Sequence, residues 1–262
     1  MNGRVLVVAG SDSGGGAGIQ ADIKAVMAMG GYAATAITAL TAQNTLGVHA
    51  VLAVPAEFVR AQMAAVLDDI GADAVKTGML GSAEIVEAVA DALTRRAPAV
   101  PLVLDPVMLA KGGAPLLAGP ALQVLRTRLL PLAALLTPNL PEAEELLGHP
   151  IHDPAQAAQA LRAIGPQAVL LKGGHAEGPT VVDVLADASG TARFERPRIA
   201  TRHTHGTGCT LASAIAALLA RGMKLRDAVR GARDYVQEAI RTAPGLGAGH
   251  GPLNHAAGCL RG

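Results

Sequence analysis

Short aliphatic runs alternate with longer alanine-rich segments along most of this sequence, and this alternation strongly constrains the fold. The aliphatic runs at residues 5–9, 74–77 and 102–105 are typical of buried strands. The segments between them repeat apolar residues at helical spacing. Because alternating strands and helices form right-handed βαβ units, the sequence predicts an α/β fold around a mostly parallel sheet.

The pattern also predicts the bounds of individual elements. Strands are predicted at residues 5–9, 32–38, 74–77, 102–105, 133–137, 168–172 and 180–186. Helices are predicted after the glycine loop to about residue 29, and at residues 55–69, 83–96, 122–130, 141–147, 154–164, 207–221 and 225–241. No linker or shift in composition divides the chain, so we expect a single domain over residues 1–262.

Composition excludes several classes of protein. Half of the 262 residues are hydrophobic and 16% are charged, which argues against disorder. The net charge is +1 and no basic stripe is present, so we expect no nucleic-acid partner. Two cysteines, Cys209 and Cys259, are too few for a disulfide framework. No apolar run is long enough to span a membrane, and we expect a cytoplasmic protein.

Two glycine-rich segments stand at the ends of predicted elements, one after the first strand and one at the start of a late helix. The first, residues 10–18, has backbone N–H groups that could line an anion, or it could be a flexible turn. It lacks both a Walker A lysine and the acidic residue of a dinucleotide fold. The second, residues 204–210, opens a helix whose N-terminus favours negative charge. Cys209 falls in that first turn, where a thiol pKa tends to fall, but Thr204 or Thr207 could simply cap a helix beside a small core cysteine.

Three polar residues, Asp105, Asn139 and Lys172, occur at or just after predicted strand ends, where ligands bind in open α/β sheets. Asn139 and Glu142 have the spacing of a helix capping box, and the same pair could serve a Mg²⁺–phosphate site. Asp105 precedes a proline and could either form a turn or face a metal. Lys172 precedes two glycines and could meet phosphates or remain solvated.

Seven motifs in this order resemble the hydroxymethylpyrimidine/phosphomethylpyrimidine kinases, within the ribokinase-like superfamily. They are AGSDSGGGAGIQAD, TALTAQNT, KTGML, LDPVMLAKGG, TPNLPEAEELLG, LLKGGH and THGTGCT. The resemblance runs from residue 4 to the GHGPLN segment at 249–254. It implies a ribokinase-like three-layer α/β/α sandwich with a mostly parallel central sheet. It also implies ATP and Mg²⁺ as cofactors, two successive phosphorylations of an aminopyrimidine for thiamine biosynthesis, and a homodimer.

The resemblance also implies roles for individual residues. Asn139, Glu142 and Asp105 would serve Mg²⁺ and phosphate, and Lys172 would face the ATP phosphates. Gly206, Thr207, Gly208 and Cys209 would form an anion hole, with Cys209 as the base. The residues that match the pyrimidine pocket are Gly10, Asp22, Gln43, Met79 and Val107. Two alternatives remain open from the sequence: a pyridoxal or pyridoxine kinase, and a catalytically silent pyrimidine-binding protein.

Overall fold

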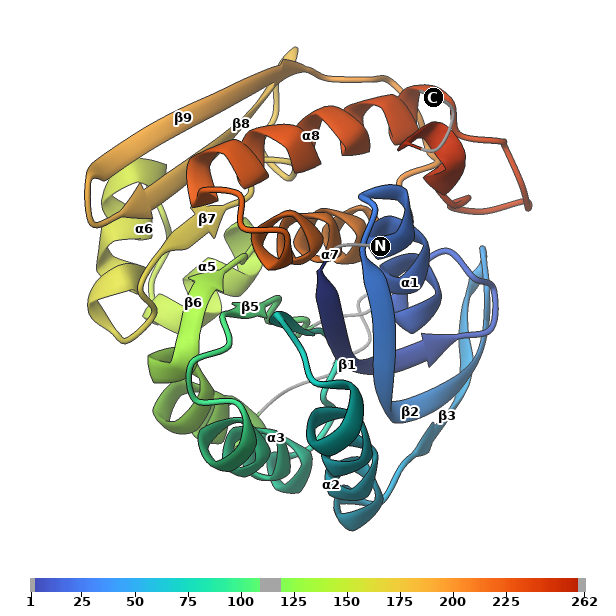
Figure 1. The fold of residues 1–262 in the computed structure, drawn as a ribbon. Coiled ribbons are helices and arrows are strands. Elements are labelled where there is room, and N and C mark those ends of the chain that lie inside the picture. Colours follow the sequence, from blue (N-terminus) through green and yellow to red (C-terminus); the bar gives the residue numbers. More distant parts are fainter. Residues whose placement is uncertain (1–2, 109–118, 259–262) are drawn as a thin grey trace.

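The predicted three-layer arrangement is confirmed in the computed structural model, which describes residues 3–108 and 119–258 (Figure 1). The described strands form one sheet in the order β3-β2-β1-β4-β5-β6-β7-β8-β9. Neighbours from β2 through β7 pair in parallel, whereas β3, β8 and β9 pair antiparallel at the two edges. The strands are β1 Arg4–Asp12, β2 Tyr32–Asn44, β3 Gly47–Ala53, β4 Ala74–Thr77, β5 Leu102–Leu104, β6 Ala133–Leu136, β7 Val169–Leu171, β8 Thr180–Asp187 and β9 Gly190–Pro197.

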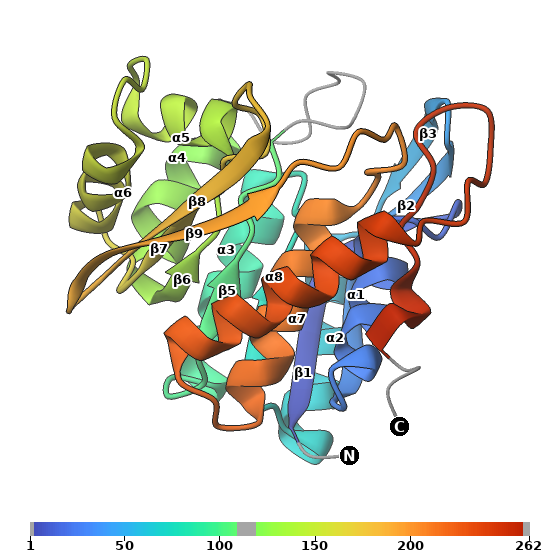
Figure 2. The same cartoon turned by 90° about the horizontal axis from the view of Figure 1, so that it is seen from above.

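Helices cover both faces of the sheet, as Figures 1 and 2 show from two directions. The α-helices are α1 Gly18–Ala28, α2 Ala56–Ala65, α3 Ala83–Arg96, α4 Pro120–Val124, α5 Leu140–Leu147, α6 Pro154–Ala163, α7 Thr207–Ala220 and α8 Leu225–Arg241. Shorter helical turns are η1 Val66–Ile70, η2 Leu125–Leu129, η3 Leu130–Leu132 and η4 His255–Gly258. No helix in the described part of the chain is long and apolar enough to cross a bilayer.

Strand β1 shows why the sheet has a core on each face. Its side chains alternate, so Leu6 and Val8 join the core under α2, α3, α5 and α6. Val5 and Val7 point the other way, into the core under α1, α7 and α8. All four are fully buried. A strand that is apolar at every position is therefore required at this place, as the aliphatic runs predicted.

The sheet edges differ most from the predictions. Strand β9 was not predicted, because its mostly exposed side chains show no apolar run. Strand β3 was not predicted either, although it contains the apolar run Ala50–Ala53, whose side chains are exposed rather than buried. Strand β2 runs to Asn44 rather than residue 38, since it continues into the antiparallel pairing with β3. The helix predicted at 122–130 is instead the short α4 followed by a π-helical turn and a 3-10 turn. By contrast, β4, α3 and α8 have the predicted bounds.

Candidate functional site

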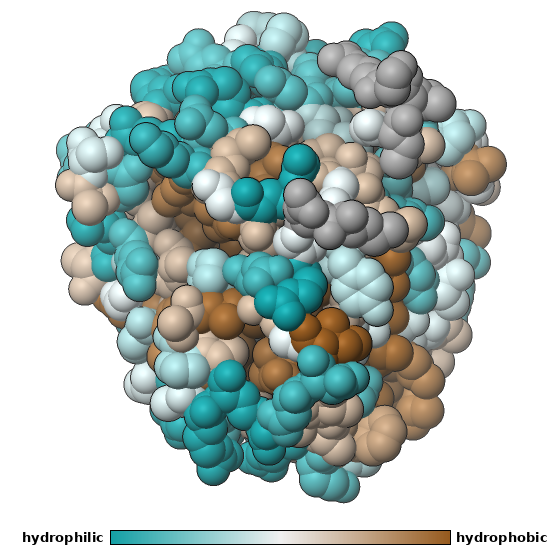
Figure 3. Space-filling model, in the orientation of Figure 1, coloured by the Kyte–Doolittle hydropathy of each residue, from teal (hydrophilic) through white to brown (hydrophobic). Residues whose placement is uncertain are grey.

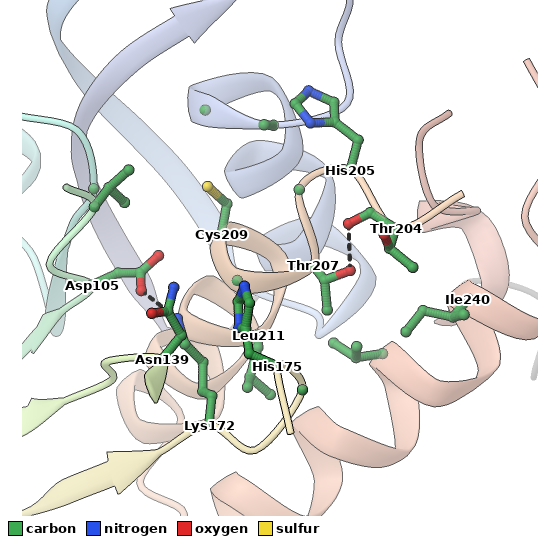
Figure 4. A pocket seen from close by; sticks show the side chains of 18 of the residues that line it. Asp105, Asn139, Lys172, His175, Thr204, His205, Thr207, Cys209, Leu211 and Ile240 are labelled. Carbon is green, nitrogen blue, oxygen red and sulfur yellow. Dashed lines mark hydrogen bonds and ion pairs between the residues drawn. The ribbon is translucent and has the colours of Figure 1, made fainter. Parts of the chain in front are cut away.

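A cleft of about 910 Å³ opens where the parallel strands end and α7 begins. The lining includes all but one of the residues singled out in the sequence: Gly10, Gln43, Met79, Val107, Asp105, Asn139, Glu142, Lys172, Gly206, Thr207, Gly208 and Cys209. These residues come from segments far apart in the chain and meet because parallel strands end at the same edge. Figure 4 shows Asp105, Asn139, Lys172 and Cys209 around one space.

Lys172 and Asp105 form an ion pair on the side of the cleft that holds β5 and β7. Lys172 Nζ lies 2.8 Å from Asp105 Oδ1 (Figure 4). Thr137 Oγ1 donates to the same oxygen at 3.1 Å. Burial lowers the pKa of Lys172, but Asp105 and Glu142 outweigh it and hold that pKa above its usual value. The ammonium is therefore a permanent positive charge in the cleft, and the solvated alternative for Lys172 is wrong.

Asn139 and Glu142 form the predicted capping box at the start of α5. Asn139 Oδ1 accepts from the Glu142 N–H at 2.9 Å, and Glu142 Oε2 accepts from the Asn139 N–H at 2.8 Å. Both residues also line the cleft, so the capping function and a binding function coexist. Burial raises the pKa of Glu142 to about 7, with Lys172 opposing and Asp105 adding to that rise. A cation bound beside this carboxyl would favour its ionised form.

The turn before α7 presents backbone N–H groups to the cleft. The N-cap is Gly206, with a φ of 81°, a residue that has no side chain to cap the helix. The N-cap position is therefore occupied by neither Thr204 nor Thr207, and Thr207 Oγ1 donates to the Thr204 carbonyl at 2.8 Å (Figure 4). A Cβ on Gly208 would lie 3.2 Å from Lys172 Nζ, so the ammonium lies against the first turn of the helix. This turn and Lys172 together favour an anion.

Cys209 is a free, partly exposed cysteine in the first turn of α7. Burial raises the pKa of its thiol to about 11, although the Lys76 ammonium opposes the rise. The sequence-based expectation of a lowered pKa is wrong, because the desolvation of the site outweighs the helix N-terminus.

The first glycine loop does not offer all its N–H groups to a ligand. The Asp12 carboxylate accepts from Gly14, Gly16 and Ala17 N–H at 2.8, 3.1 and 2.8 Å. His205 Nε2 lies 2.9 Å from the same carboxylate, and also 3.1 Å from Gln43 Nε2. Sequence reasoning missed Asp12, although an acidic residue inside a glycine run at a strand end is a signal that could have indicated it.

The two glycine segments contact each other directly. A Cβ on Gly206 would lie 1.8 Å from the Gly16 carbonyl oxygen, which leaves room for glycine alone. Gly206 also has a positive φ that disfavours other residues. The loop after β1 and the turn before α7 therefore line the same cleft.

Asp22 is the one predicted site residue that the structure places elsewhere. Its side chain is fully buried and does not line the cleft. Lys76 Nζ lies 2.8 and 3.0 Å from its two oxygens, and Ser213 Oγ donates to it at 2.7 Å. We therefore correct the expectation that Asp22 accepts hydrogen bonds from a pyrimidine.

A second lobe of the cleft lies between the segment after β9 and α8. Its lining includes the aliphatic residues Val181, Pro197, Ile199, Val236 and Ile240, beside polar side chains such as Arg198 and Gln237. Sequence reasoning missed this lobe, because its residues belong to no motif and come together only through the placement of α8 beside β9. A partly aliphatic lobe with polar side chains, next to a positively charged site that attracts anions, is suited to a flat base joined to phosphates.

Comparison with known proteins agrees with this geometry. The family model described as phosphomethylpyrimidine kinase matches residues 12–254. Thiamine biosynthesis bifunctional protein ThiED of Geobacter sulfurreducens is 54% identical over 97% of this chain, and the chain spans 52% of that protein's length. Hydroxymethylpyrimidine/phosphomethylpyrimidine kinase of Streptomyces coelicolor is 52% identical, over 96% of this chain and 93% of that protein.

Solved structures with the same fold carry two different enzyme names. Phosphomethylpyrimidine kinase of Clostridium difficile 630 is 42% identical with a TM-score of 0.80, over 90% of this chain and 99% of that one. Pyridoxal kinase of Bacillus subtilis, solved as an ADP complex, is 37% identical with a TM-score of 0.91 over 100% of both chains. The match of the family model over most of the sequence, with relatives near half identity, shows that this chain belongs to the phosphomethylpyrimidine kinase family.

Proposed function

We propose that this protein uses ATP to phosphorylate hydroxymethylpyrimidine, and then phosphorylates the monophosphate to the diphosphate, for thiamine biosynthesis. The observation that carries the proposal is one cleft with two chemically different ends. One end has the amides before α7, Lys172 and two carboxylates; the other has Gln43, Met79 and Val107. Relatives at about half identity, named for this activity, support the assignment.

The anion end suits the terminal phosphates of ATP. Gly206, Thr207 and Gly208 would provide backbone donors for the transferred phosphoryl group, and Lys172 would neutralise its charge. The partly aliphatic lobe beside α8 would hold the base. Cys209 would then lie between phosphoryl group and acceptor, where it would take the acceptor's proton.

The residues in the cleft fit a magnesium ion delivered with ATP. Among residues 3–108 and 119–258, no group of three His, Cys, Asp or Glu could hold a metal by itself. Mg²⁺ commonly binds through one or two carboxylates, waters and substrate phosphates. Asp105 and Glu142 are nearly buried carboxyl groups in the cleft, and Asn139 adds an amide. These residues would hold Mg²⁺ or its waters, and the ion would neutralise phosphate charge.

The acceptor end suits an aminopyrimidine. A Cβ on Gly10 would lie 3.2 Å from Met79 Sδ, so the absence of a side chain leaves the ring access to the thioether. Met79 and Val107 would contact the ring faces, and Gln43 both donates and accepts.

A pyridoxal kinase is the alternative that a specific observation favours. The Bacillus subtilis pyridoxal kinase aligns over the whole chain, and the Staphylococcus aureus pyridoxal kinase bound to AMP-PCP and pyridoxal has a TM-score of 0.90 at 32% identity. An ADP-release assay with hydroxymethylpyrimidine and pyridoxal under the same conditions distinguishes the two. We expect a higher kcat/KM for hydroxymethylpyrimidine, and a higher value for pyridoxal would overturn the proposal. Tight pyrimidine binding without ADP release would instead indicate a silent binding protein.

We further propose that one kinase domain spans residues 1–262, that the protein acts in the cytoplasm, where ATP is available, and that it is a homodimer. Exposed apolar side chains gather on β2, β3 and α2: Leu40 and Leu52 pair across the two strands and are 44% and 66% exposed, and Phe58 is 60% exposed. Figure 3 shows apolar residues at that edge of the molecule. The edge strand β3 could pair with its own copy in a second molecule, which favours a twofold dimer.

A further inference from the structure

A buried ion pair lies behind the wall of the cleft, and the proposed chemistry above gives it no role. Lys76, Asp22 and Ser213 are all fully buried, and they form the hydrogen-bonded group already described. Burying two charges costs free energy that their attraction often only offsets, so a buried ion pair is poor evidence for a role in stability. Its position relative to the cleft points to another role.

The ammonium of Lys76 is separated from the cleft by a glycine. Gly78 lines the cleft, and a Cβ on it would lie 2.9 Å from Lys76 Nζ. Ser213, which holds Asp22, is four residues after Cys209 on α7, so the two side chains project from the same helix face. Strand β4, helix α1 and helix α7 thus bring Lys76, Asp22 and Cys209 to one place.

The charges that face Cys209 come from four elements. Lys76 on β4 lowers the pKa of the thiol, and it is the largest influence that opposes burial. Asp22 on α1 and Asp105 after β5 raise that pKa. Lys172 after β7 also interacts with the thiol, but it is paired with Asp105. His205, in the loop before α7, is held by Asp12.

We propose that Lys76 is a positioning residue for phosphoryl transfer, and that its fixed positive charge stabilises the Cys209 thiolate. The Asp22 carboxylate holds the Lys76 ammonium in place, and Ser213 in turn donates a hydrogen bond to Asp22. The proposal rests on the proposed kinase function. In that reaction the acceptor hydroxyl oxygen bonds to the γ-phosphorus, and the bond from that phosphorus to the β–γ bridging oxygen breaks, releasing ADP. The hydroxyl proton passes to the Cys209 thiolate, which becomes a thiol and later returns the proton to solvent. Asp22 limits the effect of Lys76, so the two residues act in opposite directions.

Two variants test this opposition through the reactivity of the thiol. Only the thiolate reacts with iodoacetamide, so the alkylation rate at pH 8 follows the thiolate fraction. We expect Lys76→Met to slow alkylation of Cys209 about tenfold, since the positive charge that favours the thiolate is lost and the isolated Asp22 takes up a proton. We expect Asp22→Asn to speed alkylation of Cys209 about tenfold. Asp105 still keeps Lys76 charged in this variant, and the Asp22 carboxylate no longer offsets the positive charge of Lys76. Mass spectrometry of the Cys209 peptide separates this signal from Cys259.

The matched control is Arg4→Met, which removes one exposed positive charge at the opposite end of the sheet and should leave the alkylation rate unchanged. Changes of the same sign in Lys76→Met and Asp22→Asn would mean a role in core stability and would overturn the proposal. If Lys76→Met does not fold, Asp22→Asn still tests the proposal. An alkylation rate of Cys209 in Asp22→Asn at or below the wild-type rate would overturn the proposal. ADP release is measured in parallel, so that the two proposals are tested separately. Absence of ADP release from the wild-type protein with the pyrimidine would contradict the proposed function, whereas the alkylation rates would still test the role of Lys76.

Discussion

At the scale of single residues, the Asp12 carboxylate holds together the loops that form the acceptor end of the cleft. It accepts from three backbone N–H groups of its own loop and contacts His205 from the loop before α7. Burial would raise the pKa of Asp12, but the hydrogen bonds from His205, Ala17 and Gly14 outweigh it and hold the pKa below its usual value. The ionised carboxylate therefore stabilises the folded protein.

The first residue-scale prediction concerns stability as a function of pH. We expect Asp12→Asn to lower the free energy of unfolding at pH 7 by about 2 kcal/mol, since hydrogen bonds to a charged group are lost. Because the folded-state pKa lies below the unfolded value, this contribution is complete above the unfolded pKa and is lost as the pH falls through the folded pKa. Urea unfolding at pH 7 and pH 3 should therefore show a smaller difference at pH 3. The exposed Asp69→Asn should change stability by less than about 0.5 kcal/mol.

The second residue-scale prediction concerns Cys209 as a base. The first acceptor is a neutral alcohol that must lose a proton, whereas the second is an anionic phosphate that needs no base. Cys209→Ala should therefore slow the first phosphorylation about a hundredfold and the second much less. Single-turnover assays started from each acceptor measure the two steps separately. Equal losses would indicate that the residue acts only through core contacts or anion binding.

At the scale of elements, the contact between the glycine loop after β1 and the turn before α7 determines the shape of the site. Strand β1 and helix α7 are nearly two hundred residues apart in sequence, yet Gly206 lies against the Gly16 carbonyl. The meeting of these two loops places the amide donors of α7 opposite Gln43. A side chain at Gly206 would separate them.

The element-scale prediction compares two glycines with the same backbone conformation. Gly206 and Gly222 have φ values of 81° and 82°, but a Cβ at Gly222 would meet no atom within 4 Å. Each alanine variant bears the cost of a left-handed conformation, about 1–2 kcal/mol. Only Gly206→Ala should also lose kcat/KM by more than about tenfold, since it displaces the donor loop. ADP-release kinetics and thermal unfolding of both variants check this, and comparable activities would contradict it.

At the scale of the whole molecule, strand β3 is one of the two edge strands of the sheet, and within the described residues no further strand pairs with its outer side. Leu52 and Val51 on β3 are 66% and 50% exposed, and an unpaired edge strand exposes main-chain donors and acceptors. Association of two such edges would bury both the apolar side chains and the main-chain groups.

The whole-molecule prediction is that Leu52→Lys shifts the protein toward monomer. A lysine on an edge strand disfavours pairing with another strand, because its charge would be buried. Light scattering coupled to size-exclusion chromatography should give a lower mass than for the wild-type protein. Met27→Lys, at another exposed apolar residue on α1, should not change the mass. A wild-type protein that is monomeric at micromolar concentration would contradict the dimer.

Much of the fold and most of the site could be predicted from the sequence, because both rest on local patterns. Buried parallel strands must be apolar on both faces, so runs such as Val5–Val8 predict them directly. Asn139 and Glu142 accept hydrogen bonds from each other's backbone N–H within one helical turn, so their spacing predicts the capping box. The order of the motifs was enough to indicate the family. The edge strand β9 could not be predicted, since it carries no apolar pattern. Strand β3 carries the apolar run Ala50–Ala53, but that this run forms an exposed strand at the sheet edge is decided by tertiary structure.

Tertiary structure alone decided where the charged groups are placed and what they do. Asp22 has the residue type for a pyrimidine acceptor, but Lys76 and Ser213, from other elements, enclose it away from the cleft. Cys209 begins a helix, which locally favours a thiolate, yet burial by distant segments raises its pKa. The physical reason is that hydrogen-bonding capacity and helix dipoles are local properties, whereas desolvation and the distance between charges depend on which elements meet in space.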